Sequence, residues 1–133
     1  MKCRILLLLL LVVAAGCKEP VDREQQARQA ATEVVVRSYN HLLAGEYEQV
    51  VDCRAGADSM PATYRQQVAM AYKQFMAQQQ QAHGGISSFK VSNVQRDSTL
   101  GLMQVFLLLT FGDNTQEEIV VPAIEHNGAW RLK

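Results

Sequence analysis

The segment LGLMQVFLLLTF, residues 100–111, is the strongest strand signal in the chain. It is rich in leucine, aromatic and β-branched residues, which fit the pleated surface of a sheet. The run stops at Gly112-Asp113-Asn114, a combination that is typical of a turn. The segment therefore predicts a long strand from which the chain turns back on itself.

Both faces of this strand are apolar, because side chains alternate between the two sides of a sheet. One set comprises Met103, Val105, Leu107, Leu109 and Phe111, and the other comprises Leu100, Leu102, Phe106 and Leu108. A sheet covered by helices on one side is normally polar on its back. The pattern predicts that the back is also covered, most simply by a second copy in a back-to-back homodimer. A partner protein or a strongly curved sheet would serve as well.

Three shorter strands are expected around this segment. Residues 89–96 precede it, residues 117–124 return after the turn, and residues 129–133 close the chain. The last two are joined by His126-Asn127-Gly128, a tight hairpin signal. Pro122 cannot donate to a strand ladder, so the third strand should have an edge or a bulge there.

The first half of the domain predicts helices over residues 25–44, 46–53 and 62–82. Each carries apolar residues at steps of three and four positions. Gly45 and Gly84 are placed to end the first and third helices, and Pro61 suits the start of the third. Helices followed by an antiparallel meander indicate an α+β domain, with the helices on one face of a curved sheet of about four strands.

The N-terminus has the order of a secretory signal peptide. Lys2 and Arg4 are followed by the apolar residues 5–13 and then by Ala14-Ala15-Gly16-Cys17. The apolar run is shorter than the roughly 20 residues of a membrane-spanning helix. We expect a leader over residues 1–16, a tether over residues 17–23 and a folded domain over residues 24–133.

The end of this leader, Ala14 to Cys17, resembles the lipobox of bacterial lipoproteins, with Ala14 where leucine is usual. The resemblance implies cleavage after Gly16, a diacylglyceryl thioether on Cys17 and acylation of the new amino terminus. Several acyl chains make a stable anchor, because each buried methylene adds about 0.8 kcal/mol. Cys3 leaves with the leader and Cys17 takes lipid. Cys53 is then alone, and we interpret it as a small buried hydrophobic residue rather than a nucleophile.

Segments at both ends of the domain resemble nuclear transport factor 2-like proteins. These are residues 38–51, in which a helix ends in Gly45 and an acidic and aromatic pair follows, and residues 111–113, 117–121 and 128–132, which match the final hairpins. Together they resemble a group of uncharacterised bacterial lipoproteins with this cystatin-like fold. The resemblance implies a cone-shaped half-barrel with a pocket near its wide end. The fold hosts isomerases, dehydratases and pure binding modules, so it does not choose a function.

Few residues are candidates for catalysis, metal binding or ligand binding. The strand carboxylates lie mostly at turns or strand ends, and His41, His83 and His126 share no metal-ligand spacing, so we predict no catalytic set, metal or cofactor. Gln104 interrupts an apolar strand and needs a partner or water if it is buried. Tyr39 and Tyr72 lie on apolar helix faces, where such residues are more often core than ligand contacts. We name Gln104, Tyr72 and Tyr39 as candidate pocket-lining residues.

The net charge and the expected anchor narrow the range of functions. The chain has 13 basic and 13 acidic residues, and loss of Lys2 and Arg4 with the leader leaves 11 basic residues, a net charge of about −2. Nucleic-acid binding normally needs a basic excess, so it is not expected. We expect a binding or protein-interaction module anchored through Cys17 to the cell membrane or outer membrane, on its periplasmic or extracellular face, with a small ligand or an envelope protein as partner. An isomerase- or hydrolase-type enzyme and a structural subunit of an envelope assembly are the alternatives.

Overall fold

The computed structural model describes residues 20–133, so the predictions made for the leader and for Cys17 lie outside the described residues. Four antiparallel strands form one sheet in the order β1-β2-β3-β4, and the helices precede them in the chain. This arrangement confirms the predicted α+β class. In chain order the elements are α1 (Pro20–Leu43), α2 (Tyr47–Asp52), the short 3₁₀ helix η1 (Ala57–Ser59), α3 (Ala62–His83), β1 (Ile86–Asp97), β2 (Leu102–Phe111), β3 (Gln116–His126) and β4 (Ala129–Leu132).

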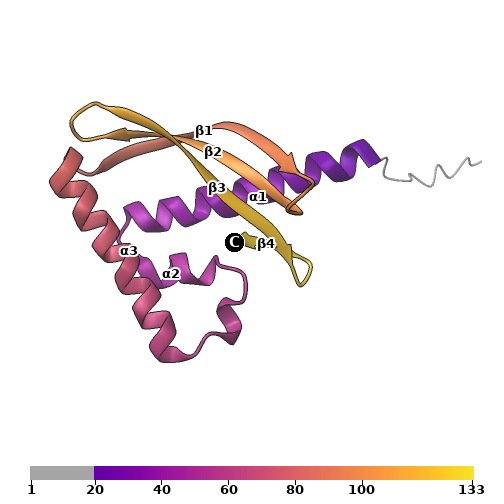
Figure 1. The fold of residues 1–133 in the computed structure, drawn as a ribbon, viewed down its shortest axis with the longest axis horizontal. Helices are drawn as coiled ribbons and strands as arrows, with labels where there is room; N and C mark the ends of the chain where they lie inside the picture. Colours follow the sequence, from indigo (N-terminus) through magenta and orange to yellow (C-terminus); the bar gives the residue numbers. More distant parts are fainter. Residues whose placement is uncertain (1–19) are drawn as a thin grey trace, which may run out of the picture.

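The sheet arches over α1, α2 lies on the other side of α1, and α3 runs from beside α2 to the edge of the sheet near the start of β1 (Figure 1). The core lies between α1 and β2. Ala31, Val34 and Val35 of α1 are buried in it, together with alternate residues of β2 that are at most 3 % exposed. These β2 residues are Met103, Val105, Leu107, Leu109 and Phe111. One of the two apolar sets of the strand therefore faces the helix.

Helix α1 begins at Pro20, earlier than the sequence predicted, so residues 20–23 are helical rather than an irregular tether. Proline is tolerated in a first helical turn because the N–H that it lacks would have no partner in the helix there. The next turn of the helix is held by a contact with the sheet. Both Glu24 carboxylate oxygens accept from Arg96 Nε of β1 at 2.9 Å, and Glu24 lies 3.6 Å from Arg28 one turn on. The part of the predicted tether from Pro20 to Arg23 is therefore the beginning of α1.

The C-terminal end of α3 is fixed against the β2–β3 turn. Gly84 follows the helix with a φ of 76°, and Gly112 packs directly against it. Gly112 donates its N–H to the Gly85 carbonyl at 2.8 Å, and Asp113 donates to the His83 carbonyl at 2.9 Å. A side-chain carbon at Gly112 would overlap the Gly84 carbonyl oxygen. This close approach sets the position of one end of α3.

The back of the sheet is the second apolar set. Leu102 is buried, Phe106 and Leu108 are half-buried, and Val120 of the neighbouring β3 is 47 % exposed. The sheet thus has an apolar strip along its back that the described residues cover only in part. Gln104 belongs to this face and its side-chain nitrogen lies 3.4 Å from an Asp97 carboxylate oxygen.

Two further predictions concern single features. Cys53 is 3 % exposed and has a free thiol, as expected for a small buried residue. Pro122 lies where the ladder between β3 and β4 begins, which confirms the expected strand edge. Of the helices in residues 20–133, none combines the length and the apolar composition needed to cross a membrane.

Candidate functional site

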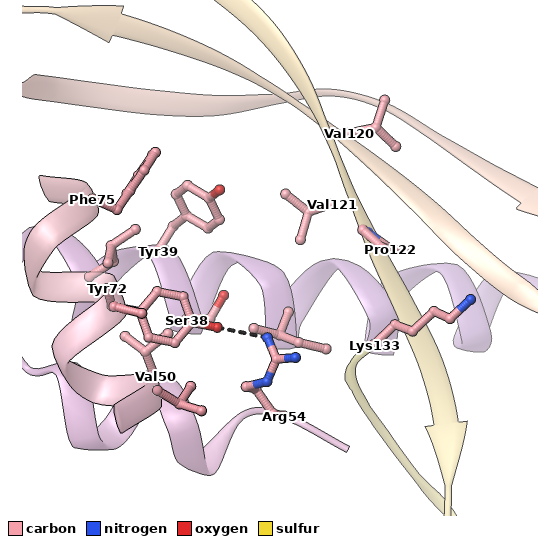
Figure 2. A pocket seen from close by; sticks show the side chains of 14 residues that line it. Ser38, Tyr39, Val50, Arg54, Tyr72, Phe75, Val120, Val121, Pro122 and Lys133 are labelled. Carbon is pink, nitrogen blue, oxygen red and sulfur yellow. Dashed lines mark hydrogen bonds between the residues drawn. The ribbon is translucent and has the colours of Figure 1, made fainter. Parts of the chain in front are cut away.

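A cavity of about 510 Å³ lies between α1, α3 and the outer edge of β3, and we call it the α3–β3 groove (Figure 2). Its size is in the range of sites that hold small ligands, about 300–1,000 Å³. Most of its lining is apolar or aromatic. The lining residues are Ser38, Tyr39, Leu42, Val50, Arg54, Val68, Ala71, Tyr72, Phe75, Val120, Val121, Pro122, Leu132 and Lys133.

The floor of the groove comes from α1. Ser38 is 1 % exposed and donates its hydroxyl to the Val35 carbonyl at 2.7 Å, so its polarity is satisfied within the helix. Tyr39 packs against Phe89 of β1 with ring centroids 5.6 Å apart. Burial raises the pKa of Tyr39 to about 12, and the proximity of Tyr72 adds to the rise. Tyr39 is therefore a neutral hydrogen-bonding group at physiological pH.

One wall of the groove is a face of α3. Val68, Ala71, Tyr72 and Phe75 recur at steps of three and four residues, which places them on one side of the helix. Phe75 is 37 % exposed, although it is a large apolar residue. The stripe that the sequence indicated as ordinary core therefore faces a cavity along part of its length.

The opposite wall is the edge of β3. Strand β4 pairs with β3 only from Ala123 to His126, so residues 116–121 have no strand on their outer side in the described part of the chain. Val120, Val121 and Pro122 all line the groove, although consecutive side chains point to opposite faces of a sheet. The groove is therefore bounded by the edge of the strand as well as by one of its faces.

Two basic residues line one end of the groove. Arg54, which follows α2, donates from Nη1 to the Tyr72 hydroxyl at 2.9 Å, and Lys133 also lines the groove (Figure 2). No aspartate, glutamate or histidine is among the lining residues. Within residues 20–133 the salt bridges are made by other residues, so Arg54 has no carboxylate partner there. The groove is apolar, with the guanidinium of Arg54 at one end.

Two of the three candidate residues from the sequence meet in this groove. Tyr39 and Tyr72 line it, whereas Gln104 lies on the back of the sheet and is not part of it. Arg54 and Lys133 were not foreseen. Arg54 is 18 positions from Tyr72, and only the turn after α2 brings the two together.

The other titratable groups are elsewhere. His83 lies 3.5 Å from Asp113 at the end of α3, and His41 lies 3.2 Å from Glu46 after α1. No cluster of three or more histidine, cysteine or acidic residues suited to a metal ion occurs among the described residues. The groove offers hydroxyl groups and cations, which can hold a ligand but do not form a carboxylate or imidazole acid–base pair.

Comparisons with known proteins bear on the fold. No family model matches the sequence, and no curated protein matches it. Among solved structures, the chain is similar to a Campylobacter jejuni protein described as a "Putative NTF2-like transpeptidase", where NTF2 stands for nuclear transport factor 2. The TM-score is 0.55 at 10 % identity, over 84 % of this chain and 96 % of the other. The fold is nuclear transport factor 2-like.

This result confirms the fold that the sequence resemblance implied. In this fold, α1 lies against the concave side of the sheet, and the α3–β3 groove opens beside the third strand. At such low identity the likeness is one of fold alone, and unrelated functions share this fold.

Proposed function

We propose that this protein is a lipid-anchored binding module of the bacterial cell envelope, and that its α3–β3 groove holds a ligand with an apolar body and a negatively charged end. The observation that carries the proposal is Arg54, a guanidinium without a carboxylate partner in the described chain, at the end of an apolar groove. The charge of an arginine persists at all physiological pH values.

The electrostatics favour an anion at that end. A carboxylate or phosphate about 4 Å from Arg54 would gain about 4 kcal/mol before desolvation, at an effective dielectric constant of about 20. The fork of donors on a guanidinium matches the two oxygens of such groups. Since Nη1 of Arg54 is already oriented by Tyr72, the side chain is held in place before a ligand arrives.

The apolar walls supply the rest of the affinity. Each methylene of a ligand that is moved from water into the groove contributes about 0.8 kcal/mol. Val68, Ala71 and Phe75 of α3 lie opposite Val121 of β3, so a ligand body between them contacts apolar atoms on two sides. The combination suits an amphipathic ligand.

The anchoring part of the proposal is supported by the sequence before the folded body. Cys17 ends a lipobox-like stretch, and helix α1 begins at Pro20, three positions later. So short a connection would hold the start of α1 near the membrane surface, with the groove residue Ser38 about 27 Å further along the helix at 1.5 Å per residue.

The back of the sheet supports a homodimer. Lys90 of β1 and Glu118 of β3 both lie opposite Leu108 of β2 in the strand register, on its two sides. Glu118 also accepts from Ser92 across β2 at 2.9 Å, which places its carboxylate over the back face. In two sheets packed back to back, a twofold axis between them and parallel to β2 would place β1 of one protomer over β3 of its partner. It would set Lys90 of one protomer over Glu118 of its partner, with Leu108 and Phe106 between them.

The test of the binding proposal uses two probes that differ only in charge. Dodecanoate should bind the purified protein, and dodecanol should bind at least about tenfold more weakly. Arg54→Gln should abolish this difference, whereas Arg37→Gln, at an exposed position of α1 away from the groove, should leave it unchanged. Equal binding of the two probes to the wild-type protein would overturn the proposal.

A further inference from the structure

The free edge of β3 has a defined set of hydrogen-bonding groups. Lys133 donates its N–H to the Pro122 carbonyl at 3.1 Å, so the peptide groups of Pro122 face the side on which β4 lies. Backbone groups alternate along a strand, with every second residue facing the same side. The N–H and C=O of Val120 and of Glu118 must therefore face that same side, beyond the end of β4.

These groups open onto the α3–β3 groove. Val120 and Val121 both line it, and Figure 2 shows the Val121 side chain directed into the groove and the Val120 side chain directed away. Val120 therefore contributes mainly the edge of the strand. The groove has a strand edge on one wall and the apolar face of α3, with Tyr72 and Phe75, on the other.

We infer that the ligand of the groove is an extended peptide segment that adds a fifth strand beside β3, with a carboxylate at the Arg54 end. The inference rests on the proposed function and names its ligand class. An edge strand with unpaired backbone groups is a template for another strand. Pairing through the main chain gives affinity, and alternate side chains that enter pockets give specificity.

The edge favours a peptide over an acyl chain. A hydrocarbon that covered the edge of β3 would desolvate the N–H and C=O of Val120 without bonding them, and each such unpaired group costs about 1–3 kcal/mol. A peptide strand in the same place satisfies these groups, and those of Glu118 if it is long enough. Its side chains on one face then lie against Val68, Ala71 and Phe75.

The carboxylate can come from two parts of a peptide. The cations lie at the Pro122 end of the free edge, near Leu132 and the residue after it. A C-terminal carboxylate placed there requires the peptide to run parallel to β3. An aspartate or glutamate side chain allows either direction. Peptides made as free acids and as C-terminal amides distinguish the two sources.

The experiment uses the full-length protein in detergent and a pool of fluorescent hexapeptides in which every second residue is apolar. We expect members of the pool to bind and to compete with dodecanoate. Methylation of alternate amide nitrogens in one register should weaken the best binder at least about tenfold, and methylation in the other register should change it less than about twofold. If C-terminal amides bind as well as free acids, the carboxylate is that of a side chain.

A protein variant tests the same edge from the other side. Val120→Pro removes an N–H that faces the groove and not β2, so proline is tolerable there. It should weaken the peptide at least about tenfold, whereas Val120→Thr, which changes the side chain but keeps the N–H, should weaken the peptide less than about twofold. Should Val120→Pro fail to fold, the methylated peptides decide the question on the wild-type protein.

The outcomes separate the two levels of the proposal. If dodecanoate binds in an Arg54-dependent way but no peptide of the pool binds, or methylation in both registers is harmless, strand addition is wrong and the proposed function stands. If neither dodecanoate nor any peptide binds, the proposed function fails as well.

Discussion

The guanidinium of Arg54 donates a 2.9 Å hydrogen bond to the hydroxyl of Tyr72, and this bond joins the turn after α2 to the middle of α3. Both residues line the α3–β3 groove. The bond therefore does two things. It ties the two helices together, and it holds a cation in a fixed direction at the end of an apolar site.

Replacing Tyr72 by phenylalanine removes the hydroxyl and keeps the ring. We expect the free energy of unfolding to fall by about 1 kcal/mol, the usual net value of one hydrogen bond, and dodecanoate to bind several-fold more weakly because Arg54 is no longer oriented. Urea unfolding and titration calorimetry measure the two effects. Tyr64→Phe, at a tyrosine that is half exposed and outside the groove, should change neither. Unaltered anion binding in Tyr72→Phe would show that Tyr72 does not position Arg54.

The half-buried Tyr39 makes the stability of the protein depend on pH in the alkaline range. Burial raises its pKa from 10.0 to about 12, with a smaller contribution from Tyr72. Below pH 10 the tyrosine is protonated in both the folded and the unfolded chain. Between pH 10 and about 12 the unfolded chain loses this proton and the folded chain keeps it, so the free energy of unfolding falls as the pH rises.

Tyr39→Phe should remove that fall in stability. The absorbance difference between wild type and Tyr39→Phe should also show one tyrosinate that forms near pH 12 in the folded protein. The prediction is wrong if the missing tyrosinate titrates near pH 10 while circular dichroism shows that the protein is still folded.

The contact between Gly84 and Gly112 predicts a steric cost. A methyl group at Gly112 would overlap the Gly84 carbonyl oxygen. The backbone is hydrogen-bonded at both glycines, so neither can easily move away. Gly112→Ala should lower the free energy of unfolding by about 1–3 kcal/mol, as overpacking does. It should also speed hydrogen exchange at the amides of residues 112 and 113.

Gly56→Ala is the matched control for that variant. Gly56 has a φ of 77° and open space around its α-carbon, so alanine there strains the backbone without crowding a neighbour. It should leave exchange at residues 112 and 113 unchanged. Equal acceleration in both variants would mean that the glycine contact does not hold α3 against the turn.

The homodimer proposal predicts a charge exchange across the twofold axis. Lys90→Glu should place two acidic side chains together at each side of the interface and raise the dimer dissociation constant at least about tenfold. Adding Glu118→Lys to that variant should restore the dimer. Sedimentation equilibrium of the detergent-solubilised protein, with Lys73→Glu on α3 as the control, tests this. A protein that is monomeric before any substitution contradicts the proposal.

The anchor is tested at position 17. The mature protein isolated from membranes should begin at Cys17, and its mass should exceed that of the chain by the diacylglyceryl and amide-linked acyl groups. Cys17→Ser should release the protein from the membrane fraction. An unmodified thiol at Cys17, or soluble export of both forms, would remove the membrane from the proposed function.

The order and class of the elements could be predicted because their signals are local. Gly45 and Gly84 do end helices, the turn after Phe111 does reverse the chain, and the strands lie within a few residues of their expected bounds. The start of α1 could not be placed. Its second turn, at Glu24, is stabilised by Arg96, a residue 72 positions away, and such a contact leaves no trace in the local pattern.

The groove was harder to predict for a related reason. Tyr39 and Tyr72 belong to periodic stripes and could be named, although the stripes alone do not separate core from cavity. Gln104 is a candidate because it is a polar residue within an apolar strand. Both faces of that strand are apolar, so the pattern could not say which face α1 covers. Arg54 lies in an irregular turn, where no sequence pattern indicates a binding residue. Its role depends on the fold around it.

Helix α3 is held at both of its ends, by Arg65 of its first turns, which donates to Asp52 and to the Ala57 carbonyl, and by Gly84 against Gly112. Inserting one residue between these supports would advance the helix by about 1.5 Å and turn everything beyond the insertion by about 100°. An insertion between Arg65 and Tyr72 would therefore either turn Tyr72 and Phe75 out of the groove or break the contact of Gly84 with Gly112. The number of residues in this helix is therefore as much a requirement of the site as their identity.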